Sequence, residues 1–436
     1  MKLPTPGEVV RDAGQTLLSG QRWRARIVLW SAGAAVGGVA VLFAWLADWA
    51  QLLLRRMLGV WPWWPWVLAP AGFALIAWIT RRWFRGAEGS GIPQTIFAQL
   101  PEAQALDPWL MRFRLAVGRV LLASAGLFCG GSIGREGPTV HVGAVITYAF
   151  ARFMPHGRSG AQQRVLILAG GAAGVAAAFN TPLAGVVFAV EELSRSFEER
   201  ASGAALTAVI LAGIVSIALV GDYTYFGHPV VASVPHTVGP AVLAVAALSG
   251  LAGGLFSRLI LAGTTGLPWM VGRWQRSYPV AFAASCGVLV AAIGTLCGNL
   301  TYGTGYQEAR SVLVGGEHLP WYYAPGRALA TLVTSLSGLP AGLLAPSLSV
   351  GAGLGQALAD AAGEPSAVPL AILGMCGYLA GVTQAPLTSF VIVMEMTAQH
   401  AMLLPLMVTA AIATAVSKLL SPPLYQTLAQ RYLPPV

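Results

Sequence analysis

Three glutamates lie in or beside long apolar stretches of the sequence, where an ionisable side chain is costly and is therefore a candidate functional group. Glu136 stands in a run from residue 120 to residue 151 whose only other charged residue is Arg135. Glu191 and Glu192 close the apolar stretch that begins near residue 165. Because burial favours the protonated form of a carboxyl group, such a residue can take up and release a proton. Proton transfer at membrane depth is the chemistry expected of such a group, and Glu136 is the leading candidate.

Three short motifs place glycines just before a proline that suits the first turn of a helix. Each motif would aim free backbone N–H groups and the positive end of a helix dipole at a common point, which makes an anion site without a fixed cation. Glycines that only let helices pack closely are the alternative for any single motif, but three motifs together favour anion binding, and the Ser90 hydroxyl adds a donor. The motifs are Gly89-Ser90-Gly91-Ile92-Pro93, Gly134-Arg135-Glu136-Gly137-Pro138 and Gly342-Leu343-Leu344-Ala345-Pro346.

The composition shows what kind of structure must position these groups. Hydrophobic residues make up 56% of the 436 residues and charged residues only 10%, and the mean hydropathy is +0.67. So few charges cannot cover the surface of a soluble protein, which excludes a soluble enzyme or a nucleic-acid-binding module. The net charge of +9 comes from basic residues between apolar runs, as at the flanks of membrane spans.

The apolar segments predict an all-α, polytopic membrane protein. Several segments are shorter than the roughly 20 residues needed to span a bilayer, and the 52 glycines and 28 prolines predict tilted helices that break inside the membrane, where they line a site. The four cysteines share no short spacing, and we expect them to be buried hydrophobes. The segments are 27–50, 63–80, 115–131, 138–154, 165–190, 203–221, 229–264, 279–299, 326–358, 367–394 and 401–420.

Basic residues predict the orientation, with a cytoplasmic N-terminal segment over residues 1–26 and the transmembrane domain over 27–425. The arginines that precede the first apolar segment and follow the second outnumber Arg55 and Arg56 between them. Four tryptophans between residues 61 and 66 suit the opposite interface. Residues 426–436 are expected to form a C-terminal tail.

An internal repeat divides the chain into halves of about 27–222 and 229–425. Residues 118–144 align with 326–352 at a constant offset of 208, with nine of 27 positions identical. Gly118, Arg119, Pro138 and Gly143 are among the residues that recur. Secondary transporters are commonly built this way, with the site at the interface of the two halves.

The two halves differ at the acidic positions. Glu191 matches Glu395, so we expect a structural role for both, capping or pairing at the end of a helix. Glu136 has Leu344 as its counterpart, and Glu192 has Met396. Two carboxylates were therefore added to a common scaffold in one half only.

Other classes of chemistry find less support. Gly130-Gly131-Ser132-Ile133-Gly134 fits the nucleophile pattern of serine hydrolases, but it lies in a glycine-rich apolar stretch, and Pro340 is the counterpart of Ser132. His141 is nearby, although no base and orienting acid can be assigned. The histidines show no metal-ligand spacing, a phosphate-binding loop is absent, and we expect neither a metal nor a cofactor.

The motifs GSGIP and GREGP, the GLLAP segment and Tyr425 in SPPLYQTL strongly resemble the CLC family of chloride channels and chloride–proton antiporters. The resemblance covers nearly the whole chain, from about Arg22 to Tyr425. It implies a homodimer in which each subunit is an inverted repeat of tilted, broken helices with its own anion pathway. It also implies a bacterial-type inner membrane protein without the cytoplasmic regulatory domain of many relatives.

By this resemblance, the Ser90 and Tyr425 hydroxyls and the backbone amides near Leu343 and Leu344 would bind the central anion. Glu136 would be the gating glutamate and outer proton acceptor, and Glu192 the inner proton glutamate of the antiporter branch. Ser90 favours chloride over nitrate, and the retained motifs argue against the fluoride-exporting branch. We therefore predict a chloride/proton antiporter, with a passive chloride channel as the alternative.

Two residues depart from the family pattern. Leu344 replaces the usual phenylalanine of G-x-F-x-P, which affects packing beside the gate. Gln94 stands where an acid often follows GSGIP, which would weaken an electrostatic feature on the intracellular side.

Overall fold

The computed structural model describes residues 20–100, 109–154, 160–193, 203–221, 223–231, 238–266, 269–364 and 366–433. In these residues the chain is helical, and its only β-type pairing is a single bridge. The predicted all-α fold is thus confirmed. Its first half contains α2 (Gly20–Val60), α3 (Trp64–Trp83), α4 (Ile92–Phe97), η1 (Trp109–Met111), α6 (Phe113–Phe128), α7 (Glu136–Phe150), η2 (Ala151–Phe153), α8 (Gly160–Phe179), α9 (Pro182–Phe188), η3 (Ala189–Leu193) and α11 (Gly203–Val220).

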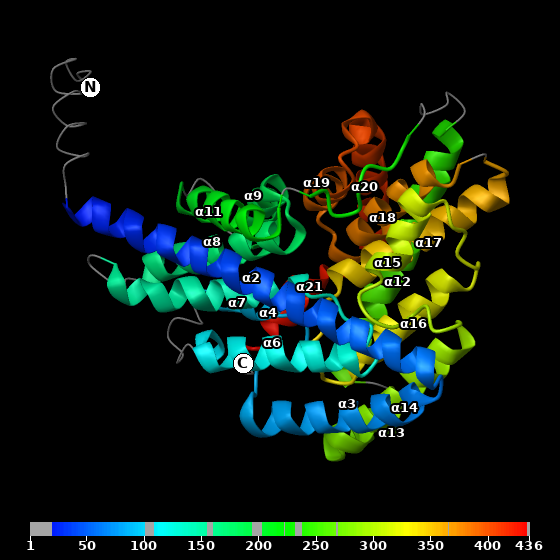
Figure 1. The fold of residues 1–436 in the computed structure, drawn as a ribbon, viewed down its shortest axis with the longest axis horizontal. Helices are drawn as coiled ribbons and strands as arrows, with labels where there is room; N and C mark the ends of the chain where they lie inside the picture. The colour runs from blue at the N-terminus through cyan, green and yellow to red at the C-terminus, as the bar shows by residue number, and fades with distance from the viewer. Residues whose placement is uncertain are drawn as a thin grey trace.

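The second half lies beside the first in Figure 1, with the colours of the chain's two halves largely on opposite sides of the molecule. It contains α12 (Val238–Gly266), α13 (Trp269–Ser277), α14 (Pro279–Leu296), α15 (Tyr306–Arg310), η4 (Ser311–Gly315), α16 (Tyr323–Leu336), α17 (Leu344–Ala362), α18 (Val368–Thr383), α19 (Pro386–Thr397), η5 (His400–Met402), α20 (Leu403–Lys418) and α21 (Leu424–Gln430).

The first helix is longer than the sequence indicated. α2 has 41 residues, which corresponds to about 61 Å at 1.5 Å per residue, twice the roughly 30 Å of a bilayer core. It begins inside the expected N-terminal segment and continues through Arg55 and Arg56, which had been placed between two helices. No glycine or proline interrupts residues 51–58, so nothing ends the helix at the last strongly apolar residue. The expected C-terminal tail likewise begins within a helix, α21.

Three apolar segments that the sequence showed as single runs each form two helices. The segments 165–190 and 367–394 break at Asn180 and Gln384, which both have a positive φ, +56° and +59°. Each break lies two residues before a proline, which cannot continue the preceding helix. The segment 326–358 breaks between α16 and α17. In the described part of the chain, five helices are long and apolar enough to cross a membrane unaided.

The two halves meet at an antiparallel bridge between Gly134 and Gly342. The Gly134 N–H donates to the Gly342 carbonyl at 2.8 Å, and the Gly342 N–H donates back at 3.1 Å. These residues lie just before α7 and α17. Because equivalent residues pair with each other, an internal two-fold axis passes between them, and the halves are inverted relative to one another.

Two further groups of hydrogen bonds, one at Gly89 and one at Gly303, are related by the same symmetry. Gly89 of the first half bonds to the loop before α17, and Gly303 of the second half bonds to the loop before α7 in the same pattern. The partners differ by the repeat offset of 208. The bonds are Gly89 N–H to Leu339 O at 3.1 Å, Ala341 N–H to Gly89 O at 3.1 Å, Gly303 N–H to Gly131 O at 3.2 Å, and Ile133 N–H to Gly303 O at 3.3 Å.

Small residues let equivalent helices cross closely in each half. A Cβ atom added to Gly143 on α7 would overlap the carbonyl oxygen of Gly170 on α8, and one added to Gly351 on α17 would overlap that of Gly374 on α18. Close approach of glycine-bearing helices replaces hydrophobic burial as the source of packing between membrane helices. The four cysteines are buried and free, as expected.

Candidate functional site

The GSGIP loop is held in place by two buried side chains. Arg119 is fully buried, and its guanidinium donates from Nη1 to the Gly89 carbonyl at 2.9 Å and from Nη2 to the Gly86 carbonyl at 3.0 Å. The Gln94 amide donates to the carbonyls of Glu88 at 2.6 Å and Gly86 at 3.2 Å. Gln94, noted above as a departure from the family pattern, therefore fixes the loop that carries the serine.

Two hydroxyl groups face each other at this loop. The Ser90 oxygen accepts the Ile92 N–H at 3.3 Å, which leaves its proton available. Tyr425, at the start of α21, is fully buried beside Ser90, and its hydroxyl has no hydrogen bond of ordinary geometry within the described residues. Two hydroxyls with free protons can donate to one anion between them.

The first turn of α17 supplies backbone donors next to the serine. Leu343 is the N-terminal cap and Leu344 the first residue of this 19-residue helix, so their N–H groups belong to the unpaired set at a helix start. Both side chains are buried. Gly137 of α7 packs so closely here that an added Cβ would lie 2.8 Å from the Ser90 carbonyl and 3.3 Å from the Cα of Gly342. The three motifs thus converge, as predicted.

Glu136 is the first residue of α7 and is completely buried. Neither carboxylate oxygen makes a hydrogen bond of ordinary geometry in the described structure, and the Nε of Arg135 lies 4.0 Å from Oε1. The backbone N–H of Ala345, in the first turn of α17, is the nearest donor from the other half. A buried carboxyl group with so few partners is costly. Glu136 begins α7, and its repeat counterpart Leu344 begins α17, so the carboxyl group and the α17 donors lie at equivalent helix starts of the two halves.

Glu191 and Glu395 have the structural role expected of them. Each caps the helix of the other half: α19 is capped by Glu191, and α9 by Glu395. A carboxylate at a helix start satisfies free N–H groups and interacts favourably with the helix dipole. The bonds to Glu191 come from the N–H groups of Leu387 at 3.0 Å and Thr388 at 2.6 Å, and those to Glu395 from Leu183 at 3.2 Å and Ala184 at 2.6 Å.

Glu192 lies in the π-helical turn η3 and is 7% exposed. Tyr425 is within electrostatic range of both Glu192 and Glu136. Tyr425 thus lies beside Ser90 and interacts electrostatically with both unmatched carboxylates. Every side chain that the sequence singled out for anion or proton binding is buried, and we call this set the buried cluster: Ser90, Glu136, Glu192, Leu343, Leu344 and Tyr425.

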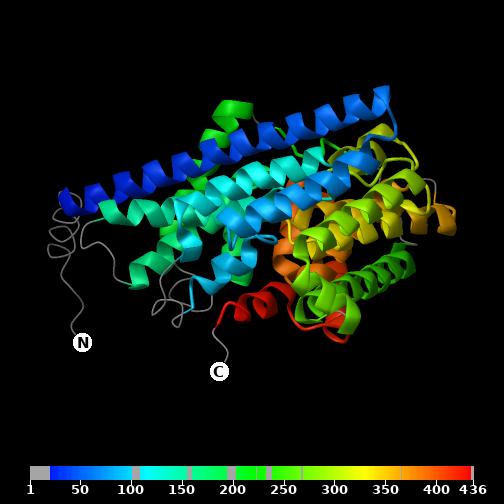
Figure 2. The ribbon, with the colours of Figure 1, turned by 90° about the horizontal axis from the view of Figure 1, so that it is seen from below.

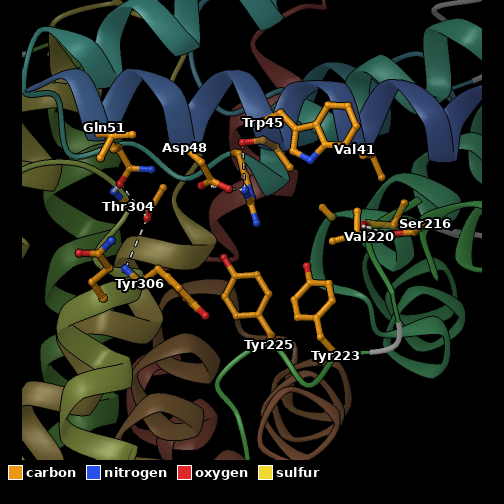
Figure 3. Close-up of a pocket in the computed structure, with 16 residues that line it drawn as sticks. Val41, Trp45, Asp48, Gln51, Ser216, Val220, Tyr223, Tyr225, Thr304 and Tyr306 are labelled. Atoms are coloured by element: carbon orange, nitrogen blue, oxygen red, sulfur yellow. Dashed lines mark hydrogen bonds and ion pairs between the residues drawn. The ribbon is translucent and has the colours of Figure 1, made fainter. Parts of the chain in front are cut away.

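Two cavities lie near these residues, one lined by Ser90 and Leu343 and the other by Arg135, the neighbour of Glu136 in the sequence. The first, which we call the Ser90 cavity, has a volume of about 340 Å³ and is lined by Ser90, Pro93 and Leu343 together with residues of α12 and of the C-terminal segment around α21. The second, the Arg135 cavity, has a volume of about 360 Å³ and lies beneath the second half of α2 (Figure 3). α2 and α21 lie on opposite faces of the molecule (Figure 2).

The Arg135 cavity contains residues that the sequence analysis missed. Asp48 accepts a hydrogen bond from the Arg135 guanidinium at 3.2 Å, and Gln51 bonds to Thr304. A signal for Thr304 was present, because Gly303-Thr304-Gly305-Tyr306 repeats the pattern of Gly89-Ser90-Gly91-Ile92. Asp48 and Gln51 had no such signal, because they lie on α2, far in sequence from their partners Arg135 and Thr304.

The hydrolase hypothesis finds no geometric support. The Ser132 hydroxyl is 2.7 Å from that of Thr331, and its backbone N–H donates to Thr334. The His141 Nε2 lies 2.8 Å from the carbonyl of Leu110. Among the described residues, no basic side chain contacts the Ser132 hydroxyl.

The fold is that of a multi-pass helical membrane protein with two inverted halves, whose broken helices meet beside a set of buried polar side chains. A family model described as "Voltage gated chloride channel" matches residues 72–418. The chain belongs to this family, the CLC chloride channels and transporters, and it is a transport protein rather than an enzyme.

Curated relatives match over most of their length. The chain is 31% identical to the "H(+)/Cl(-) exchange transporter ClcA" of Citrobacter koseri, over 92% of this chain and 87% of that protein. It is 30% identical to the "Putative chloride channel protein ClcB-like" of Ralstonia nicotianae, over 83% and 84%.

Solved structures confirm the fold. The structure of a slow cyanobacterial Cl−/H+ antiporter matches with a TM-score of 0.77 at 24% identity, over 94% of this chain and 97% of that one. A CLC-type fluoride/proton antiporter matches with a TM-score of 0.79 at 21% identity, over 94% and 98%.

Proposed function

We propose that this protein is a secondary active transporter that exchanges chloride for protons. The observations that carry the proposal are the hydroxyls of Ser90 and Tyr425, which lie beside each other, and the two buried carboxyl groups of Glu136 and Glu192, which both interact electrostatically with Tyr425. Anion donors and proton acceptors in one cluster are what coupled transport needs. The exchange activity named for the Citrobacter relative supports the same reading.

Chloride binds at the centre of the cluster. The two hydroxyls and the N–H groups of Leu343 and Leu344 donate to it, and no full positive charge holds it, so that it can leave again. The fluoride/proton antiporter among the structural neighbours makes fluoride the competing anion. Ser90 and the intact GSGIP and GREGP motifs favour chloride.

Glu136 is the gate and the outer proton carrier in this mechanism. Its carboxylate occupies the entrance between α7 and α17 as a substitute anion, close to the Ala345 N–H. Protonation removes the charge that binds it there, and the side chain moves away to admit chloride. Glu192 receives protons on the inner side, and Tyr425 interacts electrostatically with both carboxyl groups.

We further propose a homodimer in a bacterial inner membrane with a cytoplasmic N-terminus and with the two repeat halves and terminal segments given above. Each chain contains both cavities and the whole cluster, which supports one pathway per subunit. Trp61 and Trp63, between α2 and α3, and Trp66, in the first turn of α3, are exposed, as residues at a membrane interface would be. The Ser90 cavity then faces the cytoplasm and the Arg135 cavity the other side.

The test is reconstitution into liposomes with a chloride gradient and no proton gradient, while external pH is recorded. Uphill proton movement, in the presence of a clamped membrane potential that opposes it, is the expected result. Chloride flux without proton movement would contradict exchange and identify the passive channel, the activity named for the Ralstonia relative. Replacing chloride by fluoride in the same assay decides between the two anions.

A further inference from the structure

The Gly303-Thr304-Gly305 loop is a structural copy of the loop that carries Ser90. Both flanking glycines have positive φ in each copy, +75° and +81° here against +69° and +95° there. The Thr304 hydroxyl accepts the N–H of Tyr306, two residues on, at 3.4 Å, just as Ser90 accepts that of Ile92. The threonine hydroxyl is therefore presented in the same way as the serine hydroxyl.

A buried arginine holds the Gly303-Thr304-Gly305 loop, as Arg119 holds the Ser90 loop. Arg327 is fully buried, and it donates to the carbonyls of Tyr302 at 3.0 Å and Gly303 at 2.6 Å. It is the repeat counterpart of Arg119, 208 residues earlier. Both the loop and its support have thus been retained in the second half.

The two cavities correspond through the same repeat. Ser90 and Pro93 line the first cavity, and their counterparts 214 residues later, Thr304 and Gln307, line the second. Leu343 lines the first cavity, and its counterpart 208 residues earlier, Arg135, lines the second. The Arg135 cavity is therefore the inverted copy of the anion cavity.

In the Arg135 cavity, an oxygen of the protein itself accepts the hydrogen bonds of the Thr304 donors. The side-chain oxygen of Gln51 accepts the Thr304 N–H at 2.9 Å and the Thr304 hydroxyl at 3.1 Å (Figure 3). An added Cβ on Gly303 would overlap this oxygen, so the loop is shaped around it. Besides these bonds, the Gln51 side chain makes only a 3.3 Å bond to the Ala47 carbonyl of its own helix.

The surroundings suit an anion. Arg135 is 8% exposed, and its Nε has no hydrogen-bond partner in the described structure. The hydroxyls of Tyr223 and Tyr225 point into the cavity (Figure 3), and neither has a hydrogen-bond acceptor among the described residues. Asp48 is the one carboxylate that lines the cavity, and its side chain is 65% exposed.

We propose that the Arg135 cavity is a second site for a small monovalent anion, at Thr304, and that the Gln51 oxygen is a built-in substitute for that anion. The assignment of the anion class rests on the proposed function. Gln51 thereby prevents the Arg135 cavity from retaining an anion. Removal of the Gln51 side chain frees the Thr304 donors to bind one.

The test is bromide binding to the full-length protein. Crystals of the wild type, Gln51→Ala and Leu52→Ala, soaked in bromide, are compared by anomalous scattering. Leu52 is the matched control because it lines the same cavity from the same helix and makes no hydrogen bond to Thr304. We expect a bromide peak beside the Thr304 hydroxyl in Gln51→Ala only, and a much weaker one when Thr304→Val is added.

A second measurement does not require crystals. Isothermal titration of the same variants in detergent should show one more bromide per chain for Gln51→Ala than for the wild type. Folded Gln51→Ala protein without a peak at Thr304 and without the additional bromide would overturn the proposal, and Gln51 would then only tether α2. Bromide at Ser90 reports separately on the proposed function, so the two can fail independently.

Discussion

Replacing Glu191 by alanine should destabilise the fold and leave proton coupling intact. The carboxylate accepts two backbone N–H groups in the first turn of α19, at 3.0 and 2.6 Å. A hydrogen bond to a charged group contributes about 1.5–3 kcal/mol. Because the Leu387 donor lies near the exposed side of the helix, we take the lower half of that range, roughly 3–4 kcal/mol for the two bonds together.

The expected shift in melting temperature follows from chain length. Unfolding entropy is about 2.1 cal/mol/K per residue, so 436 residues give about 0.9 kcal/mol/K. A loss of 3–4 kcal/mol therefore lowers Tm by about 3–4 °C. Glu191→Gln keeps one acceptor oxygen and should lose about half as much.

The assay is thermal unfolding in detergent, followed with a thiol-reactive dye, because all four cysteines are buried in the folded protein. Glu395→Ala is the matched variant, since this residue caps α9 with the same geometry, and it should lose as much stability. The neighbouring Glu192→Gln, which removes no such cap, should melt like the wild type. A Tm of Glu191→Ala within 1 °C of the wild type, or a loss of proton coupling in that variant, would refute the reasoning.

Three further predictions concern the two unmatched carboxyl groups and the bridge between the halves. Glu136→Ala should conduct chloride without moving protons in the liposome assay, because the truncated side chain can neither block the pathway nor carry a proton; retained proton pumping would contradict the gating role. Glu192→Gln should lose proton movement while chloride still passes, and unchanged coupling would move the inner role to another group. Gly342→Ala should fail to fold or melt far below the wild type, because its Cβ would overlap the Gly134 carbonyl, whereas Gly38→Ala, where an added Cβ meets nothing within 4 Å, should melt at or above the wild-type temperature.

Much of the fold could be predicted because the physics of a bilayer is visible in a sequence. Apolar runs, glycines and prolines predicted the all-α class and the broken character of the helices, although not their number, and the offset of 208 revealed the repeat. The ends of helices were harder: α2 continues to Val60 because exposed arginines at a membrane boundary do not stop a helix. The breaks at Asn180 and Gln384 depend on a left-handed residue that composition alone does not mark.

The site was predicted in part for a similar reason. Ser90, Glu136 and Leu343 sit in compact motifs, so their chemistry can be recognised locally. Gln51 meets Thr304 across 253 residues of sequence, and Asp48 meets Arg135 across 87; contacts of this kind arise from the path of α2 and leave no local pattern. The weak similarity between the two glycine loops was the one available clue, and it concerned Thr304 alone.

The exchange of helix caps between the halves bears on how such a chain can arise. Glu191 caps a helix of the second half, and Glu395 caps the equivalent helix of the first, which is the reciprocal pattern of a contact between two identical subunits. A half expressed alone would bury a carboxylate and a set of N–H groups that only an oppositely oriented copy could satisfy. Two separate halves could make the same bonds only as an antiparallel pair with opposite orientations in the membrane, and joining them in one chain makes that pairing permanent.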